Sequence, residues 1–163
     1  MSVVARRPFA VEPVVLETDV VRLEPMTINH APALFEASQD ETIWRYLPFA
    51  RPDDIDGMAR IVEAAFARRD AGFEQPFVII DKASGSLAGS TRYLDIQALH
   101  RGVEIGWTWI AADFRRTAVN THAKFLLMGH AFETLGAIRV CLKTDSRNER
   151  SQRAIERIGA QRE

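Results

Sequence analysis

The chain has 163 residues, of which 47% are apolar and 26% are charged, as in an ordinary globular protein of one domain. A net charge of −1 argues against broad electrostatic binding to nucleic acid, and the one cysteine, Cys141, excludes an internal disulfide framework and fits a reducing, cytoplasmic compartment. The amino end has arginines but no continuous apolar segment after them, so we expect neither a secretory signal nor a membrane anchor. We expect a flexible head over residues 1–13 and a single domain over 1–163.

The first half of the domain predicts a strand pair and two helices. Residues 14–25 have the pattern of strand, turn and strand, and a helix is expected over residues 28–38. Residues 41–54 combine two prolines with aromatic side chains that follow no period, which is typical of a loop. Asp53 and Asp54 then open a second helix, which should end near Gly72.

The second half predicts a hairpin, a further strand and a strand–helix–strand unit. The expected strands cover residues 76–81, 86–94, 102–110 and 138–143, and the expected helices cover residues 119–135 and 148–158. Antiparallel hairpins followed by one parallel crossover make a mixed α/β sheet.

The strand over residues 102–110 alternates regularly. Its period of two places Val103, Ile105, Trp107 and Trp109 on one face. We therefore expect Glu104 on the face opposite the two tryptophans.

Two adjacent arginines, Arg115 and Arg116, stand in a short segment between a predicted strand and a predicted helix. The first N–H groups of a helix lack partners, and the helix dipole is positive at that end, so such a turn can bind an anion. Two guanidinium groups there could take phosphate oxygens in bidentate pairs. A basic, solvent-exposed start of an ordinary helix fits the same residues, and this stretch alone does not separate the two interpretations.

The turn also resembles a family motif. Arg115-x-x-Ala118-x-Asn120, after a strand and opening a helix, resembles the Gln/Arg-x-x-Gly-x-Gly/Ala loop of the GNAT family of N-acetyltransferases. Asn148-x-x-Ser151 before a helix that ends in glycine is similar to a second family segment. Glu-Ile-Gly-Trp at 104–107 resembles a strand of the branch that acetylates ribosomal-protein N-termini, and LETDVVRLEPM and WRYLP are weaker matches. The resemblance spans roughly residues 14–160 and implies a GNAT-like fold, a mostly antiparallel sheet with a central β-α-β unit that binds acetyl-coenzyme A (acetyl-CoA).

The family holds the pyrophosphate of acetyl-CoA on the backbone N–H groups of this loop and the pantetheine arm between two separated strands. The cofactor-binding residues that the resemblance implies are Trp109, Ile110, Arg115, Arg116, Thr117, Ala118, Val119, Asn120, Thr121 and Asn148. A backbone N–H near Trp109–Ala111 would stabilise the oxyanion. We expect Ala118 to keep an ordinary backbone conformation, and Asn120 to tolerate the tight turn or to cap the helix. Asn148 would bind the pantetheine arm, or serve only as a helix N-cap.

Acetyl transfer to an amine needs a base, and Glu104 is the candidate. It lies beside Gly106, whose missing side chain would leave space for an acceptor, and partial desolvation would favour its role as a base. A strand glutamate that faces solvent or pairs with Arg92 or Arg101 fits the same position. Ser151 is the candidate acid for the departing thiolate, with an ordinary helix serine as the alternative.

Aromatic residues of the predicted loop over 41–54 line the acceptor side by resemblance. They are Trp44, Tyr46 and Phe49, although burial in the core is the other interpretation for such side chains. The four histidines show no ligand spacing, so no metal site is predicted.

These features predict an acetyl-CoA-dependent transferase that acetylates a primary amine, either a protein N-terminus or a small molecule. The alternative is a non-catalytic CoA-binding or assembly module with the same fold. Family members add two strands after the last helix, and we expect these C-terminal strands to be missing after Glu163. The open edge of the strand over 138–143 then predicts a homodimer, in one form strand-swapped, and we expect no nucleic-acid or membrane partner.

Overall fold

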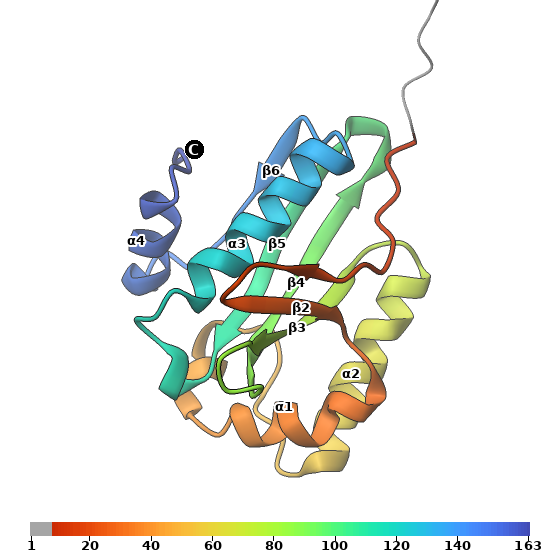
Figure 1. Cartoon of the computed structure of the whole chain (residues 1–163). Helices are drawn as coiled ribbons and strands as arrows, with labels where there is room; N and C mark the ends of the chain where they lie inside the picture. The colour runs from red at the N-terminus through yellow and green to blue at the C-terminus, as the bar shows by residue number, and fades with distance from the viewer. Residues whose placement is uncertain (1–7) are drawn as a thin grey trace, which may run out of the picture.

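A six-stranded mixed sheet forms the centre of the computed structural model, which describes residues 8–163 (Figure 1). Its strands follow chain order: β1 Leu16–Glu17, β2 Val21–Pro25, β3 Gln75–Asp81, β4 Leu87–Gln97, β5 Gly102–Ile110 and β6 Arg139–Cys141. Every neighbouring pair is antiparallel except β5 and β6, which are parallel. The predicted hairpins and the single parallel crossover are confirmed.

Helices cover both faces of the sheet. The α-helices are α1 Ala31–Ala37, α2 Ile55–Asp70, α3 Val119–Gly129 and α4 Glu149–Arg157, and the short helical turns are η1 Ile28–His30, η2 Glu41–Tyr46, η3 Ala98–His100, η4 Ala112–Phe114 and η5 His130–Thr134. The loop predicted over 41–54 therefore begins with a 3₁₀ helix, because the Asp40 carboxylate accepts the Thr42 N–H at 2.8 Å and caps it. The helix predicted over 119–135 changes to a π-turn at His130 and stops before Gly136, whose φ is +70°.

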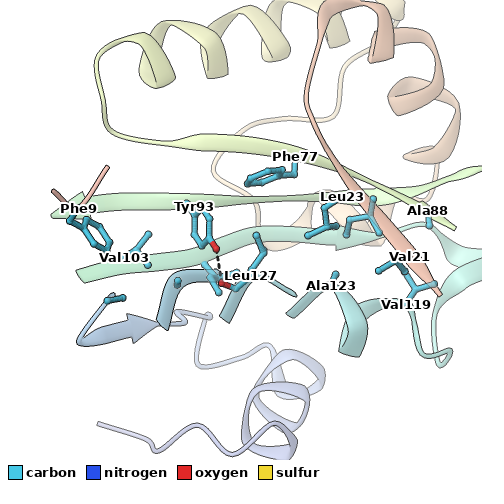
Figure 2. Packing of buried hydrophobic residues seen from close by; sticks show 14 residues of the cluster. Phe9, Val21, Leu23, Phe77, Ala88, Tyr93, Val103, Val119, Ala123 and Leu127 are labelled. Atoms are coloured by element: carbon cyan, nitrogen blue, oxygen red, sulfur yellow. Dashed lines mark hydrogen bonds between the residues drawn. The ribbon is translucent and has the colours of Figure 1, made fainter. Parts of the chain in front are cut away.

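The core cluster on the α3 face packs this helix onto β2–β5 (Figure 2). Leu127 of α3 is fully buried, and its carbonyl accepts the Tyr93 hydroxyl at 2.5 Å. Phe9 is buried in the same cluster. The expectation of a flexible head over 1–13 is therefore wrong for Phe9, and residues 1–7 of that segment lie outside the described residues.

The other face of the sheet carries α1, α2 and η2. Met58 and Val62 of α2 pack there with Trp44 of η2 and Trp109 of β5. The two clusters therefore divide the core, with α3 on one side and the helices from the first half of the chain on the other (Figure 1).

A β-bulge in β5 changes which residues face each side. Ser90 pairs with Trp109 but Arg92 pairs with Gly106, so Trp107 and Thr108 together oppose one residue of β4. Trp107 has a φ of +46° at this point. Because an extra residue reverses the alternation, Val103 and Ile105 pack under α3 whereas Trp109 packs on the α2 face. The prediction of one face for all four residues was wrong, and Glu104 shares a face with Trp109.

Helix α4 stands beside the edge formed by β6 rather than on the sheet, and none of its residues is fully buried (Figure 1). Among residues 8–163, no helix combines the length and the apolar character needed to cross a bilayer. The predicted strand exchange between two copies stays a prediction.

Candidate active site

The turn between β5 and α3 is held by its own side chains. Thr117 donates its hydroxyl to the Phe114 carbonyl at 2.6 Å and accepts the Val119 N–H at 3.3 Å. The left-handed residue of the turn is Arg116, with a φ of +60°, whereas Ala118 has a φ of −72°. Ala118 therefore needs no glycine, as predicted, because the unusual conformation lies two residues earlier.

The start of α3 offers free hydrogen-bond donors. The N-cap residue is Ala118, which has no side-chain acceptor, so Asn120 lies inside the helix and is not its cap. Within residues 8–163, no acceptor is bonded to the backbone N–H groups of Asn120 and Thr121. These donors and the helix dipole form a potential anion site of the kind expected from the sequence.

The two arginines of the turn differ in their contacts. Arg115 donates from Nη1 to Asp40 Oδ2 at 2.7 Å and from Nε to the Ile110 carbonyl at 3.3 Å. The Thr42 hydroxyl and N–H, followed by Arg115, lower the pKa of Asp40 to about 2, so this pair stays charged at neutral pH. Arg116 is exposed and forms no ion pair within the described part of the chain. Arg115 neutralises Asp40 and fastens the turn to η2, and the binding of phosphate by the two guanidinium groups stays a prediction.

The edge of β5 is open next to this turn. β6 pairs with β5 only as far as Glu104 and Cys141, so the rest of β5 has no neighbour on that side among the described residues. Ala111 donates its N–H to the Ala88 carbonyl at 2.8 Å and cannot serve as an oxyanion donor. Since antiparallel partners alternate, the N–H of Ile110 points away from β4 toward the open edge. Of the predicted Trp109–Ala111 donors, Ile110 is the one that remains.

Glu104 is buried on the face that carries Trp109, with 8% of its surface exposed. Its Oε2 is 2.7 Å from Lys143 Nζ, so its partner is neither Arg92 nor Arg101. That ion pair raises the pKa of Lys143. The space beside Gly106 is not empty: a Cβ there would lie 2.9 Å from a Leu94 methyl and 3.1 Å from Glu104 Oε1. The expected acceptor space is thus filled by Leu94 and by Glu104 itself.

Asn148 and Ser151 meet at the start of α4. The Asn148 amide oxygen accepts the Ser151 N–H at 3.2 Å, which makes Asn148 the N-cap of this helix. Among the described residues, no acceptor is bonded to its amide nitrogen. Tyr46 of η2 donates its hydroxyl to the Arg147 carbonyl at 3.2 Å, one residue before the cap. The predicted acceptor-side and cofactor-side residues therefore meet at this point.

The aromatic residues of the acceptor side divide into two groups. Trp44 is buried and donates its indole N–H to the Ser38 carbonyl, so it belongs to the core. Phe49 is half-buried and meets Trp107 edge to face, with ring centroids 5.5 Å apart. Phe49 and the half-buried Trp107 thus form a wall near the bulge.

A partly buried ionic cluster supports this wall and was not predicted. Glu74 is fully buried and accepts from Arg68 and, at 2.9 Å, from Arg92. The Arg92 guanidinium lies 4.9 Å from the Trp107 ring, and that of Arg68 lies 5.9 Å away. Burial lowers the pKa of Arg92, and the Glu74 carboxylate opposes this effect. Two cations on one carboxylate leave the wall with a net positive charge.

Lys124 is a second feature that sequence reasoning missed. It is 7% exposed, and its Nζ donates to Thr108 Oγ1, which also contacts Thr91 Oγ1 at 2.8 Å. Burial alone lowers the pKa of Lys124 to about 7. The sequence held one signal of this burial. Lys124 lies four residues after Asn120 and three before Leu127, at the margin of the apolar stripe of this helix.

The structure has a further hollow, away from this turn. A hollow of about 440 Å³ lies at the far end of β5, lined by Gln97, Leu99, His100, Arg101, Gly102, Ile138 and Arg139. Because β5 runs its full length between this hollow and the turn, the hollow belongs to a different region. Among residues 8–163, no group of three histidine, cysteine, aspartate or glutamate side chains is arranged to hold a metal ion.

Comparison with known proteins identifies the family to which this geometry corresponds. Residues 21–161 match the family described as "Acetyltransferase (GNAT) domain". A stretch of 75 residues, 46% of the chain, is 37% identical to the Bacillus subtilis (strain 168) protein named "Putative ribosomal N-acetyltransferase YdaF" and spans only 40% of that protein. A GCN5-related N-acetyltransferase from Brucella melitensis superimposes with a TM-score of 0.85 at 30% identity, over 91% of this chain and 68% of that one. Mycobacterium smegmatis RimJ, solved in complex with CoA-disulfide, has the same fold, with a TM-score of 0.79 at 20% identity over 97% and 79% of the two chains.

Proposed function

The chain belongs to the GNAT family of acetyltransferases, and on this premise we propose that it transfers the acetyl group of acetyl-CoA directly to a primary amine. The observation that carries the proposal is the position of the free N–H groups at the start of α3 beside the unpaired edge of β5. The N–H groups suit a pyrophosphate, and the unpaired edge of β5 can pair with the amides of an extended pantetheine arm. The complex of RimJ with CoA-disulfide supports the same ligand class for this fold.

Each part of the site has a distinct task in this proposal. Asn120, Thr121 and the exposed Arg116 bind phosphate oxygens, and the Asn148 amide nitrogen donates to the pantetheine arm. The Ile110 N–H donates to the thioester oxygen, where negative charge develops during attack. The thioester supplies an activated acetyl group whose thiolate leaves readily, since a thiol has an ordinary pKa near 8.5.

Glu104 is the proposed base for the acceptor amine. It is buried on the acceptor face, and its partner Lys143 has a side chain that is 69% exposed. Because an exposed ion-pair partner is held weakly, an incoming ammonium group can take its place on the carboxylate. Glu104 then accepts the proton that the amine must lose before it attacks. Ser151 stays the proposed acid for the thiolate.

The acceptor is proposed to be a protein N-terminus or a small-molecule amine, bound against Phe49 and Trp107 with Tyr46 at the margin. The name of YdaF supports the first class. The positive charge of the Arg68–Glu74–Arg92 cluster favours acceptors that carry a carboxylate or carbonyl oxygen near the amine.

Calorimetric titration of the chain with acetyl-CoA tests the cofactor site. We expect Arg116→Ala to weaken binding by about 3- to 10-fold, because it removes one exposed charge-assisted contact to phosphate. Arg60→Ala, an exposed arginine of α2 outside the proposed site, is the matched control and should leave the affinity unchanged. Equal affinities for wild type and Arg116→Ala would contradict the phosphate assignment. An acceptor screen that detects no acetylated amine despite tight binding would favour the non-catalytic CoA-binding module.

A further inference from the structure

Lys143 places a primary amine of the protein itself on the proposed base. Its Nζ is 2.7 Å from Glu104 Oε2, and most of its side chain is exposed to solvent. The ion pair joins the last paired residue of β5 to a residue just after β6, since Glu104 pairs with Cys141 and Lys143 follows two positions later. The amine thus lies where the two strands begin to separate.

The position matters because the proposed thioester site begins at the same point. Beyond Glu104, the β5 edge is unpaired as far as Ile110, among the described residues. A pantetheine arm along that edge would bring its thioester end toward the amine that Glu104 already holds. An acceptor from solution would have to displace this amine.

We propose that Lys143 is acetylated in cis, with the chain's own amine as an acceptor for acetyl-CoA. This rests on the proposed function, because it uses the same base and the same acetyl donor. Glu104 Oε2 accepts a proton from the Lys143 ammonium, and Nζ then forms a bond to the acetyl carbon. The bond between that carbon and the CoA sulfur breaks, and the sulfur leaves as a thiolate that takes up a proton. The products are Nε-acetyl-Lys143, free CoA thiol and one proton.

The chain supplies internal controls, because its three lysines differ in environment. Lys82 is on the surface and pairs with Glu17 of β1 at 3.5 Å, so it is also a lysine with a carboxylate partner, but that partner belongs to another strand than β5. Lys124 is buried in the core. Preferential reaction of Lys143 would therefore reflect its place at the site rather than the mere presence of a carboxylate.

Acetylation would change the charge at the base. An acetylated lysine has no positive charge and cannot form the ion pair with Glu104. The modified chain would therefore present an unpaired carboxylate at the acceptor side, with a neutral amide beside it.

Peptide mass spectrometry of the 163-residue chain incubated with isotope-labelled acetyl-CoA and no added amine tests the proposal. We expect label on Lys143 well above that on Lys82, at a first-order rate that does not change when the protein is diluted. Glu104→Gln should slow the labelling of Lys143 by about 10²- to 10⁴-fold, as loss of a general base does, whereas Glu17→Gln should leave it unchanged.

Calorimetry on the same sample separates this proposal from the proposed function. If the chain binds acetyl-CoA but labels Lys143 no faster than Lys82, acetylation in cis is overturned and the cofactor site stands. A labelling rate that rises in proportion to protein concentration overturns it too, because it reports transfer between molecules. If the folded wild-type chain does not bind acetyl-CoA at all, the proposed function fails and the inference fails with it. The wild-type comparison of the two lysines holds even if Glu104→Gln does not fold.

Discussion

Replacing the buried Lys124 with methionine is expected to stabilise the protein, and to do so in a pH-dependent way. The Lys124 amine is 7% exposed and has one hydrogen-bond partner of its own, the Thr108 hydroxyl. Methionine has a similar length and no charge to desolvate. The hydroxyls of Thr108 and Thr91 would still bond to each other after the change.

The magnitude follows from the proton linkage of this one group. Burial lowers the pKa of Lys124 from 10.5 to about 7. At about 1.4 kcal/mol per pKa unit, this burial costs about 5 kcal/mol of folding free energy at pH 7 and below. Loss of the hydrogen bond to Thr108 offsets about 1 kcal/mol of the gain. We therefore expect Lys124→Met to raise the free energy of unfolding by about 3–4 kcal/mol near pH 6–7.

The sign of the pH dependence is opposite to that of a stabilising ion pair. Between pH 7 and 10.5 the unfolded chain holds a proton on Lys124 that the folded chain has lost. The stability of the wild type therefore rises with pH in this window. The Lys124→Met variant has no titrating group at this position, so its stability lacks this rise. The difference between the two proteins should be largest at or below pH 7 and should shrink as the pH approaches 10.

Urea unfolding followed by tryptophan fluorescence at pH 6, 7, 8 and 9 measures this difference. With an m-value of about 2 kcal/mol/M, the midpoint should rise by about 1.5–2 M urea at pH 6. Lys82→Met, at an exposed site, should show no such pH-dependent gap. A variant that is less stable than the wild type at pH 6, or a gap that stays constant to pH 9, would refute the reasoning.

Glu74→Gln is expected to destabilise the fold by about 3–5 kcal/mol, because it leaves the buried Arg92 charge without its carboxylate; a chemical-denaturation midpoint unchanged from wild type would contradict this. Gly89→Ala should cost at least about 3 kcal/mol, since its Cβ would lie 2.2 Å from the Trp109 carbonyl oxygen, and a normal melting temperature would show that the strands separate easily there. Asn148→Ala should lower the free energy of unfolding by about 1 kcal/mol through loss of the α4 cap, which corresponds to about 2–4 °C in melting temperature. Asn148→Asp should retain most of the stability that the cap contributes. Equal melting temperatures for the alanine and aspartate variants would argue against the cap.

Much of the fold could be predicted because it depends on local signals. Strand β3 is a short apolar run, and α2 begins at Asp54, whose carboxylate accepts the Gly57 N–H at 2.7 Å. The turn before α3 could be located in the same way, because a strand, two arginines and a helical stripe follow one another directly.

The errors have a common physical origin. The bulge at Trp107 depends on the register between β4 and β5, which a single strand's alternation does not contain. The bond from Arg115 to Asp40 joins residues 75 positions apart, and neither residue type indicates the other. Glu104 was expected beside an empty space, yet its neighbours Leu94 and Lys143 come from two other segments.

Short helix η2 is bound at both ends to segments that are proposed to contact CoA. Asp40, its cap, holds Arg115 of the turn before α3, and Tyr46, its last residue, holds the backbone just before the Asn148 cap of α4. The segment that continues to Phe49 and the acceptor wall is thus anchored to both proposed contact points for CoA. If the acceptor binds against Phe49 as proposed, we expect a shift of either anchor to displace the acceptor wall as well. If the chain acts on an amine as proposed, we expect mutations in η2 to change the Michaelis constant for the amine and the affinity for the acetyl donor together.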